Sequence, residues 1–234
     1  MTRPPEAILL DVGGIFLLPS HSHIRSALAQ VGHAVTDDEA IDRAHYQAVR
    51  AFPMDLEGDE FMGPMWTEYL RIYASSLEVP HHLTEEAIDH LRNEYVTGLL
   101  WSHLIPGSVE GLRALVATGV PVGVVSNSDG TIEARLREMA VLQVGPGPGV
   151  DVRCVIDSGT VGVEKPDPAI FGPALEILGV SPADVWYVGD TPGFDVVGAR
   201  RAGLWPVLMD PFGLNGDFGA KTVGSLTEVA GLAS

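Results

Sequence analysis

The chain has 234 residues, of which 46% are hydrophobic and 19% charged, a composition typical of a globular protein. Its formal net charge of -17 at pH 7 opposes binding to nucleic-acid phosphates or to an anionic membrane surface, so we expect neither as a partner. Cys154 is the only cysteine, which excludes an intrachain disulfide and fits a reducing compartment. No secretory signal or membrane-spanning apolar run is present, so we expect a cytoplasmic protein.

A short apolar run near the amino end, at residues 7–10, is followed by a carboxylate and two glycines. Four apolar residues bounded by a turn signal predict a buried strand with Asp11 at its carboxyl end. Gly13 and Gly14 have no Cβ, so the backbone there can turn sharply and lie close to a ligand. Open parallel sheets carry their chemistry at this edge, which makes Asp11 the first candidate functional residue.

The next block, as far as about Trp101, has helical patterns and no convincing strand. Acidic residues at 37–39 suit the amino end of one of its helices, and Thr84 begins another. The predicted apolar faces consist of Ile24, Leu28 and Val31; Phe61, Met62, Met65, Trp66, Tyr69 and Leu70; and Ile88, Leu91, Tyr95 and Leu99. We predict a helical insertion in which the stripe from Phe61 to Tyr69 forms core rather than a substrate pocket.

From Pro106 the pattern alternates between helix and strand, which is typical of a parallel sheet covered by helices. Strands are predicted at residues 120–125, 153–156, 185–188 and 206–209. Helices are predicted at 108–118, with Ser108 as cap, at 131–141, at 167–178 and in a segment ending at Ala202, while 145–149 and 210–225 are predicted loops. The sequence thus predicts an α/β fold, a three-layer α/β/α Rossmann-like core of residues 1–18 and 104–234, with residues 19–103 inserted as a helical domain.

Four polar signals stand at the ends of the predicted strands or in the loops that follow them: Asp11; Ser126 with Asn127; Lys165; and Asp190 with Asp195. Each alone has an ordinary explanation, because a serine often caps a helix, a lysine is often solvated and an aspartate suits a helix amino end. Their order and their shared place at strand ends favour one composite site.

Four motifs carry a resemblance to a known superfamily: LLDVGG, VVSNSDG, GVEKPDPAIF and VGDTPGFDVVGARRAGL. They resemble the nucleophile strand, the Ser/Thr strand, the lysine motif and the Gly-Asp-x-x-x-x-Asp motif of the haloacid dehalogenase-like hydrolases. The resemblance covers residues 5–16 and 104–210. It implies that the helical domain at 19–103 is the cap that members of this superfamily carry between the first two motifs.

The resemblance implies a Mg²⁺-dependent phosphomonoesterase that acts on a small phosphorylated metabolite through an aspartyl-phosphate intermediate, as a monomer or homodimer. Hydrolysis of a phosphate ester needs an in-line nucleophile and positive charge around the equatorial oxygens. The implied catalytic residues are Asp11, as nucleophile, and Lys165, which also neutralises phosphate charge. Ser126 and Asn127 are the implied phosphate ligands. The implied metal ligands are Asp11, the Gly13 carbonyl and Asp190, with Asp195 as ligand or support.

One position departs from the superfamily pattern. Most of its phosphatases carry a second Asp two residues after the nucleophile, which protonates the leaving oxygen and activates water, and here that position is Gly13. Loss of a general acid-base group costs roughly 10²–10⁴ in rate. His21 or His23 is a hypothetical replacement, to be rejected if His21→Ala and His23→Ala leave turnover and its pH profile unchanged. The remaining histidines, including His81, His82 and His103, are interpreted as surface or core residues.

Two other functions stay open. A 2-haloacid dehalogenase also uses an Asp nucleophile without the second Asp, but it needs no metal and tends to lack the first Asp of the fourth motif, which Asp190 retains here. A non-catalytic binding or regulatory protein would have had no need to keep Asp11, Ser126 and Lys165 together. The phosphatase is therefore the favoured prediction.

Overall fold

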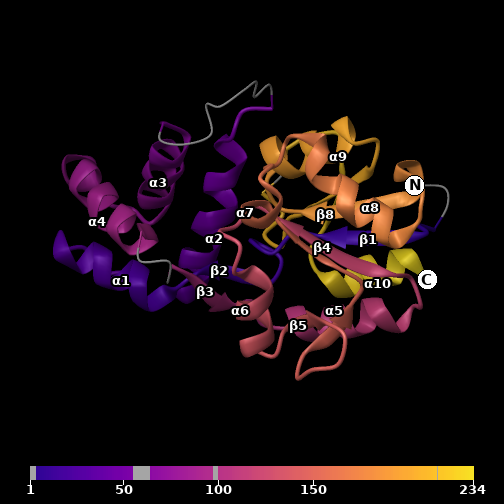
Figure 1. Cartoon of the computed structure of the whole chain (residues 1–234). Coiled ribbons are helices and arrows are strands. Elements are labelled where there is room, and N and C mark those ends of the chain that lie inside the picture. Colours follow the sequence, from indigo (N-terminus) through magenta and orange to yellow (C-terminus); the bar gives the residue numbers. More distant parts are fainter. Residues whose placement is uncertain (1–3, 55–63, 97–99, 215) are drawn as a thin grey trace. The chain divides into compact units, whose positions relative to one another are not determined.

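A computed structural model describes residues 4–54, 64–96, 100–214 and 216–234 (Figure 1). The chain divides into two compact units, one formed by Met1–Phe16 with Pro106–Ser234 and the other by Leu17–Ile105. We call them the α/β unit and the helical unit. Among the helices that the structure describes, none has the length and apolar character needed to cross a membrane.

The α/β unit is built around a parallel sheet in which the described strands follow the order β10-β9-β8-β1-β4-β7. The strands are β1 (Ala7–Leu10), β4 (Val122–Ser126), β7 (Val155–Asp157), β8 (Val185–Gly189), β9 (Trp205–Met209) and β10 (Lys221–Val223). Strand β1 lies between β4 and β8, and all four of its side chains are fully buried. Burial on both faces explains why its sequence is apolar without alternation.

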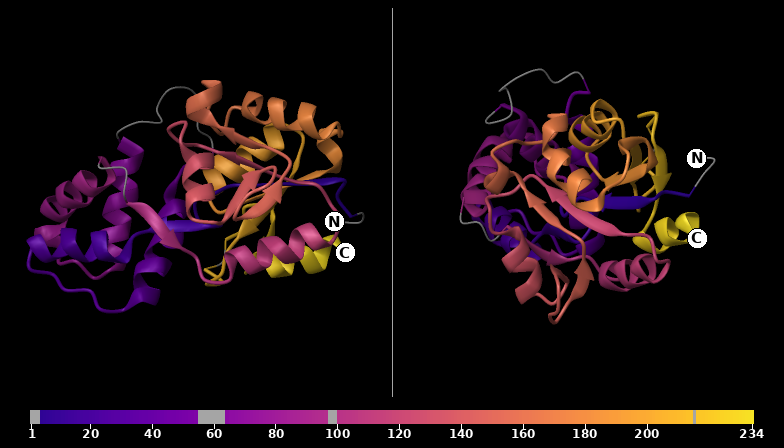
Figure 2. Two further views of the ribbon diagram at one scale, coloured as in Figure 1. Left: turned by 60° about the horizontal axis from the view of Figure 1, so that its bottom comes forward. Right: turned by 45° about the vertical axis from the view of Figure 1, so that its right-hand side comes forward.

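Helices cover both faces of this sheet, which confirms the predicted three-layer α/β/α architecture (Figures 1 and 2). On one face α5 (Ser108–Ala117) and α10 (Leu226–Ala233) lie side by side. A Cβ on Gly111 would lie 2.7 Å from the Leu226 Cβ, so these two helices pack very closely. On the other face α8 (Gly172–Leu178) and α9 (Val197–Arg201) cover a core that includes Leu9, Phe171 and Tyr187.

The register of the central strands brings their carboxyl ends to one edge of the sheet. Leu10 pairs with Val124 of β4 and with Val188 of β8. The chain therefore leaves these three strands at Asp11, after Ser126 and after Gly189, all at that edge. Short segments follow the strands at this edge: α6 (Ile132–Glu138) after β4, α7 (Ser158–Val161) and the 3₁₀ turn η3 (Pro168–Phe171) after β7, and the π-helical turn η5 (Pro192–Val196) after β8. The 3₁₀ turn η4 (Pro182–Asp184) instead comes directly before β8.

Several local predictions for this unit are wrong. The predicted loop at 145–149 is confirmed, but the two strands that it connects, β5 (Leu142–Val144) and β6 (Val150–Val152), which pair in parallel, were not predicted. Strand β10 lies inside the predicted loop at 210–225. Strands of three residues carry no readable alternation. Ser108 does not cap α5, because the N-cap is Gly107 in a left-handed conformation and α5 begins at Ser108 itself.

The helical unit consists of four described helices and a small antiparallel sheet. Its elements are α1 (His21–Gln30), α2 (Asp38–Ala48), η1 (Val49–Ala51), α3 (Pro64–Ser76), η2 (His81–Leu83) and α4 (Thr84–Val96). Strand β2 (Leu17–Pro19) pairs with β3 (Trp101–Leu104), so the chain enters and leaves the unit along one two-stranded ribbon. The prediction of a block without strands is wrong at this ribbon, whose strands are too short to show a period of two.

The predicted apolar faces form much of the core of the helical unit. The buried members are Ile24, Leu28, Tyr69, Leu70, Ile88 and Leu91. Val31, Met65 and Trp66 are half-buried. Phe61, Met62 and Leu99, and the side chain of Tyr95, lie outside the described residues.

Candidate active site

Lys165 is at the centre of a buried cluster at the carboxyl edge of the sheet. Its side chain is 2% exposed, and its Nζ lies 2.8 Å from Asp11 Oδ1 and 2.8 Å from Asp195 Oδ1. The same Nζ donates a hydrogen bond of 2.8 Å to the Tyr187 hydroxyl. The hydrogen bonds to Asp195 and Tyr187 use two of the three N–H donors of the ammonium, and the Asp11 contact is an ion pair.

The loop after β8 fixes the two carboxylates of the fourth motif. The Thr191 backbone N–H donates to Asp195 Oδ2 at 2.8 Å, and the Thr191 hydroxyl donates to Asp190 Oδ1 at 2.9 Å. A Cβ on Gly189 would lie 2.3 Å from the Asp195 carboxyl carbon. Only glycine at 189 lets the π-helical turn η5 fold back so that Asp195 reaches Lys165.

The turn after β1 also depends on a glycine. Gly14 has a φ of +63°, and a Cβ there would lie 2.0 Å from Asp190 Oδ2. The backbone thus passes directly against the Asp190 carboxylate. Gly13, two residues after Asp11, is half-buried and contributes no side chain to the cluster.

The cluster holds more negative than positive charge. Carboxylate oxygens of Asp11, Asp190 and Asp195 lie within 4.8 Å of one another, and Lys165 compensates one charge of the three. Burial raises the pKa of Asp11 to about 7, although Lys165 acts in the opposite direction. Burial disfavours the Lys165 ammonium, but Asp11 and Asp195 outweigh it and raise the Lys165 pKa above its ordinary value. Lys165 therefore stays charged.

The residues of the cluster fit a divalent cation with a preference for oxygen. Asp11 Oδ1 is buried and accepts no well-directed hydrogen bond from any residue that the structure describes, so its charge is met by the Lys165 contact alone. A divalent cation beside Asp11 and Asp190 would cancel the surplus negative charge, and carboxylate oxygens suit Mg²⁺. Asp195 is less available, because Lys165 and Tyr187 contact its Oδ1 and Thr191 binds its Oδ2.

Ser126 and Asn127 follow the cluster on the neighbouring strand. Ser126 is the last residue of β4, is buried, and pairs with Asp157 of β7. The Asn127 side chain is joined to the Lys165 backbone: Nδ2 donates to the Lys165 carbonyl at 3.1 Å, and the Lys165 N–H donates to Oδ1 at 2.8 Å. Asn127 thus holds the lysine loop in place, a contact that the sequence did not indicate.

Sequence reasoning missed two further residues that organise this edge. The Tyr187 hydroxyl donates to the Val125 carbonyl at 2.9 Å while it accepts from Lys165, and burial raises its pKa well above the ordinary value. Asp157 accepts from the N–H groups of Gly130 at 2.9 Å and Ile132 at 3.1 Å, which orders the loop after β4. Within strands, both residues look like ordinary core or capping residues, so no sequence signal distinguishes them.

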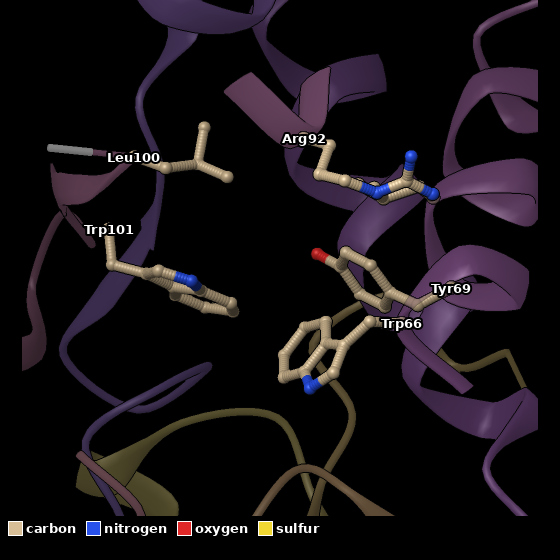
Figure 3. Close-up of a pocket in the computed structure, with 6 residues that line it drawn as sticks. Trp66, Tyr69, Arg92, Leu100 and Trp101 are labelled. Carbon is tan, nitrogen blue, oxygen red and sulfur yellow. The ribbon is translucent and has the colours of Figure 1, made fainter. Parts of the chain in front are cut away.

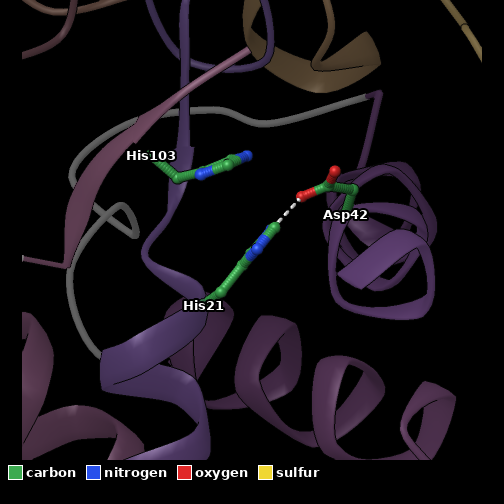
Figure 4. Close-up of side chains that lie close together, drawn as sticks. All are labelled: His21, Asp42 and His103. Carbon is green, nitrogen blue, oxygen red and sulfur yellow. Dashed lines mark hydrogen bonds and ion pairs between the residues drawn. The ribbon is translucent and has the colours of Figure 1, made fainter. Parts of the chain in front are cut away.

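The helical unit brings together titratable groups that the sequence left scattered (Figure 4). His21 Nε2 lies 2.7 Å from Asp42 Oδ1, and its Nδ1 lies 3.1 Å from Asp38 Oδ1. The His103 ring stacks on His21 with a centroid separation of 3.8 Å. Burial and then the nearby His21 lower the pKa of His103. His23 Nδ1 lies 2.5 Å from Glu94 Oε2. Carboxylates in the helical unit therefore engage both histidines that we considered as acid-base replacements.

A small aromatic pocket also lies in the helical unit (Figure 3). Its lining consists of Trp66, Tyr69, Leu70, Arg92, Leu100 and Trp101, around a volume of about 30 Å³. The Tyr69 hydroxyl is hydrogen-bonded to His45 Nδ1 at 2.9 Å, and the Arg92 guanidinium contacts Asp89 and Thr67. The stripe that we predicted as core thus supplies core residues and one wall of this pocket.

Comparisons with known proteins give one consistent family. The model of the haloacid dehalogenase-like hydrolases matches residues 6–203. The phosphoserine phosphatase of Thermus thermophilus is 46% identical over 67 residues, which are 29% of this chain and 27% of that protein. The chain spans about a quarter to a half of the length of three curated relatives that it matches.

Solved structures share the fold over nearly the whole chain. A HAD phosphatase from Thermococcus onnurineus has a TM-score of 0.55 and 21% identity, with 97% of this chain and 96% of that chain covered. A 2-haloacid dehalogenase from Pseudomonas syringae has a TM-score of 0.53 and 16% identity, with the same coverage of 97% and 96%. At these identities the likeness shows the fold and does not separate the two activities.

Proposed function

Because the chain belongs to the haloacid dehalogenase-like hydrolase family, we propose that it is a Mg²⁺-dependent phosphomonoesterase that acts on a small phosphorylated metabolite. The observation that supports this most directly is the buried cluster, in which a single ammonium contacts Asp11 and Asp195 at 2.8 Å while Asp190 lies alongside. The cluster joins a carboxylate nucleophile, a fixed cation and a second carboxylate suited to a metal. Phosphatases among the curated relatives agree with this choice.

In the proposed reaction Lys165 meets the charge of both reactants. Its Nζ lies beside Asp11 Oδ1, the side from which the carboxylate would approach phosphorus. Asp195 and Tyr187 hold that ammonium in place, so no reorganisation is needed when negative charge develops on the phosphoryl oxygens. Ser126 and the Asn127 backbone N–H would bind the remaining phosphate oxygens, since the N–H groups of Ser128, Gly130 and Ile132 donate to Ser158 and Asp157. Asn127 contributes by positioning the Lys165 loop.

The residues proposed to hold Mg²⁺ are Asp11, the Gly13 carbonyl and Asp190, with Asp195 as support through Lys165. Bound Mg²⁺ would reduce the repulsion between the carboxylate and the phosphate dianion. Asp190 is kept in place by the Thr191 hydroxyl and by close contact with the Gly14 backbone. The same contacts would orient it without a metal.

The proposed chemistry has two displacements at phosphorus. An Asp11 oxygen forms a bond to phosphorus while the bond to the leaving oxygen breaks, which leaves an acyl phosphate on Asp11. Water then attacks phosphorus, releases inorganic phosphate and restores the Asp11 carboxylate. Gly13 can neither protonate the leaving oxygen nor take a proton from water. We therefore expect slow turnover, and much faster release of leaving groups that are stable as anions.

We propose that the helical unit acts as a cap that selects the substrate. Its aromatic pocket, of about 30 Å³, has room for no more than a water-sized group, so the proposal rests on the position of this unit between the first two motifs and not on the pocket. Closure of a lid or domain over an active site excludes water during chemistry in many enzymes. The identity of the metabolite would then depend on residues of the helical unit.

Gly13 favours a second candidate, a 2-haloacid dehalogenase. A halide leaves as a stable anion and needs no proton, so the missing acid would not slow that first step. Against it, a dehalogenase needs no cation, and the buried pair Asp190 and Asp195 would carry an electrostatic cost without a purpose. The phosphatase therefore remains the better proposal.

The test compares phosphate release from p-nitrophenyl phosphate and from an alkyl sugar phosphate, with Mg²⁺ or EDTA. We expect Mg²⁺-dependent release that is much faster for the nitrophenyl ester and is lost in Asp11→Asn. Halide release from fluoroacetate or a 2-chloro acid, in EDTA, would support the dehalogenase instead. Mg²⁺ binding without release from any substrate would indicate a non-catalytic binding protein.

A further inference from the structure

We propose that the helical unit carries a second metal site, for a divalent transition-metal ion such as Zn²⁺, formed by His21, Asp42 and His103. The three side chains come from three elements that are distant in sequence: the first residue of α1, the middle of α2 and strand β3. One ligand atom from each lies within 4.8 Å of the others. This inference does not depend on the proposed phosphatase activity.

The side chains are aimed at one another. Figure 4 shows the rings of His21 and His103 pointing toward the carboxylate of Asp42. His21 Nε2 already lies 2.7 Å from Asp42 Oδ1, and the two rings stack with an interplanar angle of 28°. Ligand atoms around tetrahedral Zn²⁺ are about 3.3 Å apart, as bond lengths of about 2.0–2.1 Å require. Because the lone pair of an imidazole nitrogen lies in the plane of its ring, the two stacked rings would have to turn away from each other to share one ion.

A second observation supports His21 as a metal ligand. Its Nδ1 lies 3.1 Å from Asp38 Oδ1, on the side of the ring away from Asp42, and Arg25 forms an ion pair with Asp38. A histidine that binds a metal usually donates its other ring N–H to a carboxylate, which fixes the tautomer and the orientation of the ring. The ion pairs that link Arg25 to Asp38 and Asp38 to His21 therefore hold the His21 ring with its Nε2 toward Asp42 and His103.

His103 has ring nitrogens to offer. Within the part of the chain that the structure describes, its ring makes the stacking contact with His21 and no hydrogen bond. The ring is half-buried on β3, where His103 pairs with Leu18 of β2, so its position is set by the ribbon. A half-buried imidazole without a hydrogen-bond partner can accept a metal at little cost in lost contacts.

The donor set selects the kind of metal. Two imidazoles and one carboxylate suit Zn²⁺, Co²⁺ or Ni²⁺, whereas Mg²⁺ prefers oxygen ligands. The Asp11 cluster offers only carboxylates, so the two sites should take different metals. A metal on His21, Asp42 and His103 would also connect α1, α2 and β3, and would hold the helices against the ribbon through which the chain enters and leaves.

The test measures Zn²⁺ binding to the full chain by calorimetry in excess Mg²⁺, with Co²⁺ absorption as an independent probe of imidazole ligation. We expect one Zn²⁺ per chain, and an affinity reduced at least about 10- to 100-fold in His103→Ala and in Asp42→Asn, because each substitution removes a ligand. His82→Ala, at an exposed position on η2, is the matched control and should bind as the wild type does.

Circular dichroism shows whether each variant is folded, and His103→Cys tests the site if His103→Ala is not. A cysteine retains a metal ligand, so we expect His103→Cys to keep binding and to give Co²⁺ a new thiolate charge-transfer band. The proposal is wrong if the wild type binds no Zn²⁺, or if a folded His103→Ala binds Zn²⁺ as the wild type does. Loss of binding in His82→Ala would equally overturn it.

Discussion

At the scale of single residues, the candidate site depends on one buried ammonium. Lys165 contacts two carboxylates and a phenol, and none of these partners can reach water easily because all are buried. Such an arrangement is costly unless it stays complete, since removal of one partner leaves the others charged and uncompensated. The stability of the α/β unit and the proposed chemistry therefore depend on the same side chain.

Replacement of this lysine tests that dependence on stability. We expect Lys165→Met to lower the free energy of unfolding at pH 8 in EDTA by about 3–5 kcal/mol, because Asp11 and Asp195 lose their cation. Lys221→Met, at an exposed position on β10, is the matched control and should stay within about 0.5 kcal/mol. Urea unfolding measures both. Equal effects of the two substitutions would mean that Lys165 contributes no more to the free energy of unfolding than the exposed Lys221 does.

The raised pKa of Asp11 makes a prediction about pH. Its pKa is about 7 in the folded chain against 3.8 ordinarily, so between these values the folded protein holds a proton that the unfolded chain has lost. This carboxyl therefore makes the metal-free protein less stable as pH rises from about 4 to about 7. An asparagine does not ionise, so Asp11→Asn does not lose this stability as pH rises. Relative to wild type it should gain about 2–3 kcal/mol between pH 5 and pH 8 in EDTA, at 1.36 kcal/mol per pKa unit.

Urea unfolding at the two pH values measures that gain, and Asp184→Asn serves as a control at a carboxyl outside the cluster. A difference between Asp11→Asn and wild type that does not change with pH would show that Asp11 titrates normally.

At the scale of elements, two turns place the carboxylates. The turn after β1 brings Gly14 against Asp190, and the π-helical turn η5 returns Asp195 to Lys165. Neither turn has room for a side chain at its glycine, since a Cβ at Gly14 or Gly189 would overlap a carboxylate. The geometry of the site is therefore fixed by backbone packing as much as by the functional side chains.

Two alanine substitutions distinguish backbone strain from steric overlap with Asp190. Gly14 and Gly119 both have positive φ, but a Cβ at Gly119 has no neighbour within 4 Å, whereas one at Gly14 would lie 2.0 Å from Asp190 Oδ2. Gly119→Ala should cost about 1 kcal/mol of stability and leave Mg²⁺ binding unchanged. Gly14→Ala should also weaken Mg²⁺ binding at least tenfold, as calorimetry would show. Unchanged Mg²⁺ affinity in Gly14→Ala would argue against Asp190 as a ligand.

The elements also show how far the sequence could be interpreted. The runs at β1, β4 and β8 are apolar and long enough to be recognised, and the polar residues at their ends followed from the parallel arrangement. Strands β2, β3 and β10 include a proline or polar residues within their three or four positions, so they form no continuous apolar run and were missed. Tyr187 lies within the predicted strand at 185–188, and nothing in the sequence indicates that its hydroxyl accepts a hydrogen bond from Lys165.

At the scale of the whole molecule, an acidic chain concentrates three buried carboxylates in one place. The net charge of -17 does not attract anions, so the local positive charge at the site comes from Lys165 and, in the proposed function, from a bound cation. The second cluster, of His21, Asp42 and His103, could not be predicted from the sequence. Its members are separated by 21 and 61 positions and meet only after the helical unit folds.

Mg²⁺ should stabilise the whole chain in a pH-dependent way. Because Asp11 must lose its proton to bind a cation and its pKa is about 7, Mg²⁺ affinity should fall about tenfold per pH unit below that value. The increase in Tm caused by Mg²⁺ at about 5 mM, in excess over the protein, should therefore be larger at pH 8 than at pH 6. Asp190→Asn should show little increase at either pH. An equal increase at both pH values would contradict a site that contains Asp11.

The most direct test of the central claim asks whether Asp11 takes up the phosphoryl group. Because Gly13 cannot activate water, the acyl phosphate should accumulate during turnover. Acid quenching of the enzyme with p-nitrophenyl phosphate and Mg²⁺, followed by borohydride reduction and peptide mass spectrometry, should convert Asp11 to homoserine. Reduction at Asp11 that depends on substrate is the expected result. Phosphate release with an unmodified Asp11, or with the modification at another carboxylate, would contradict the account.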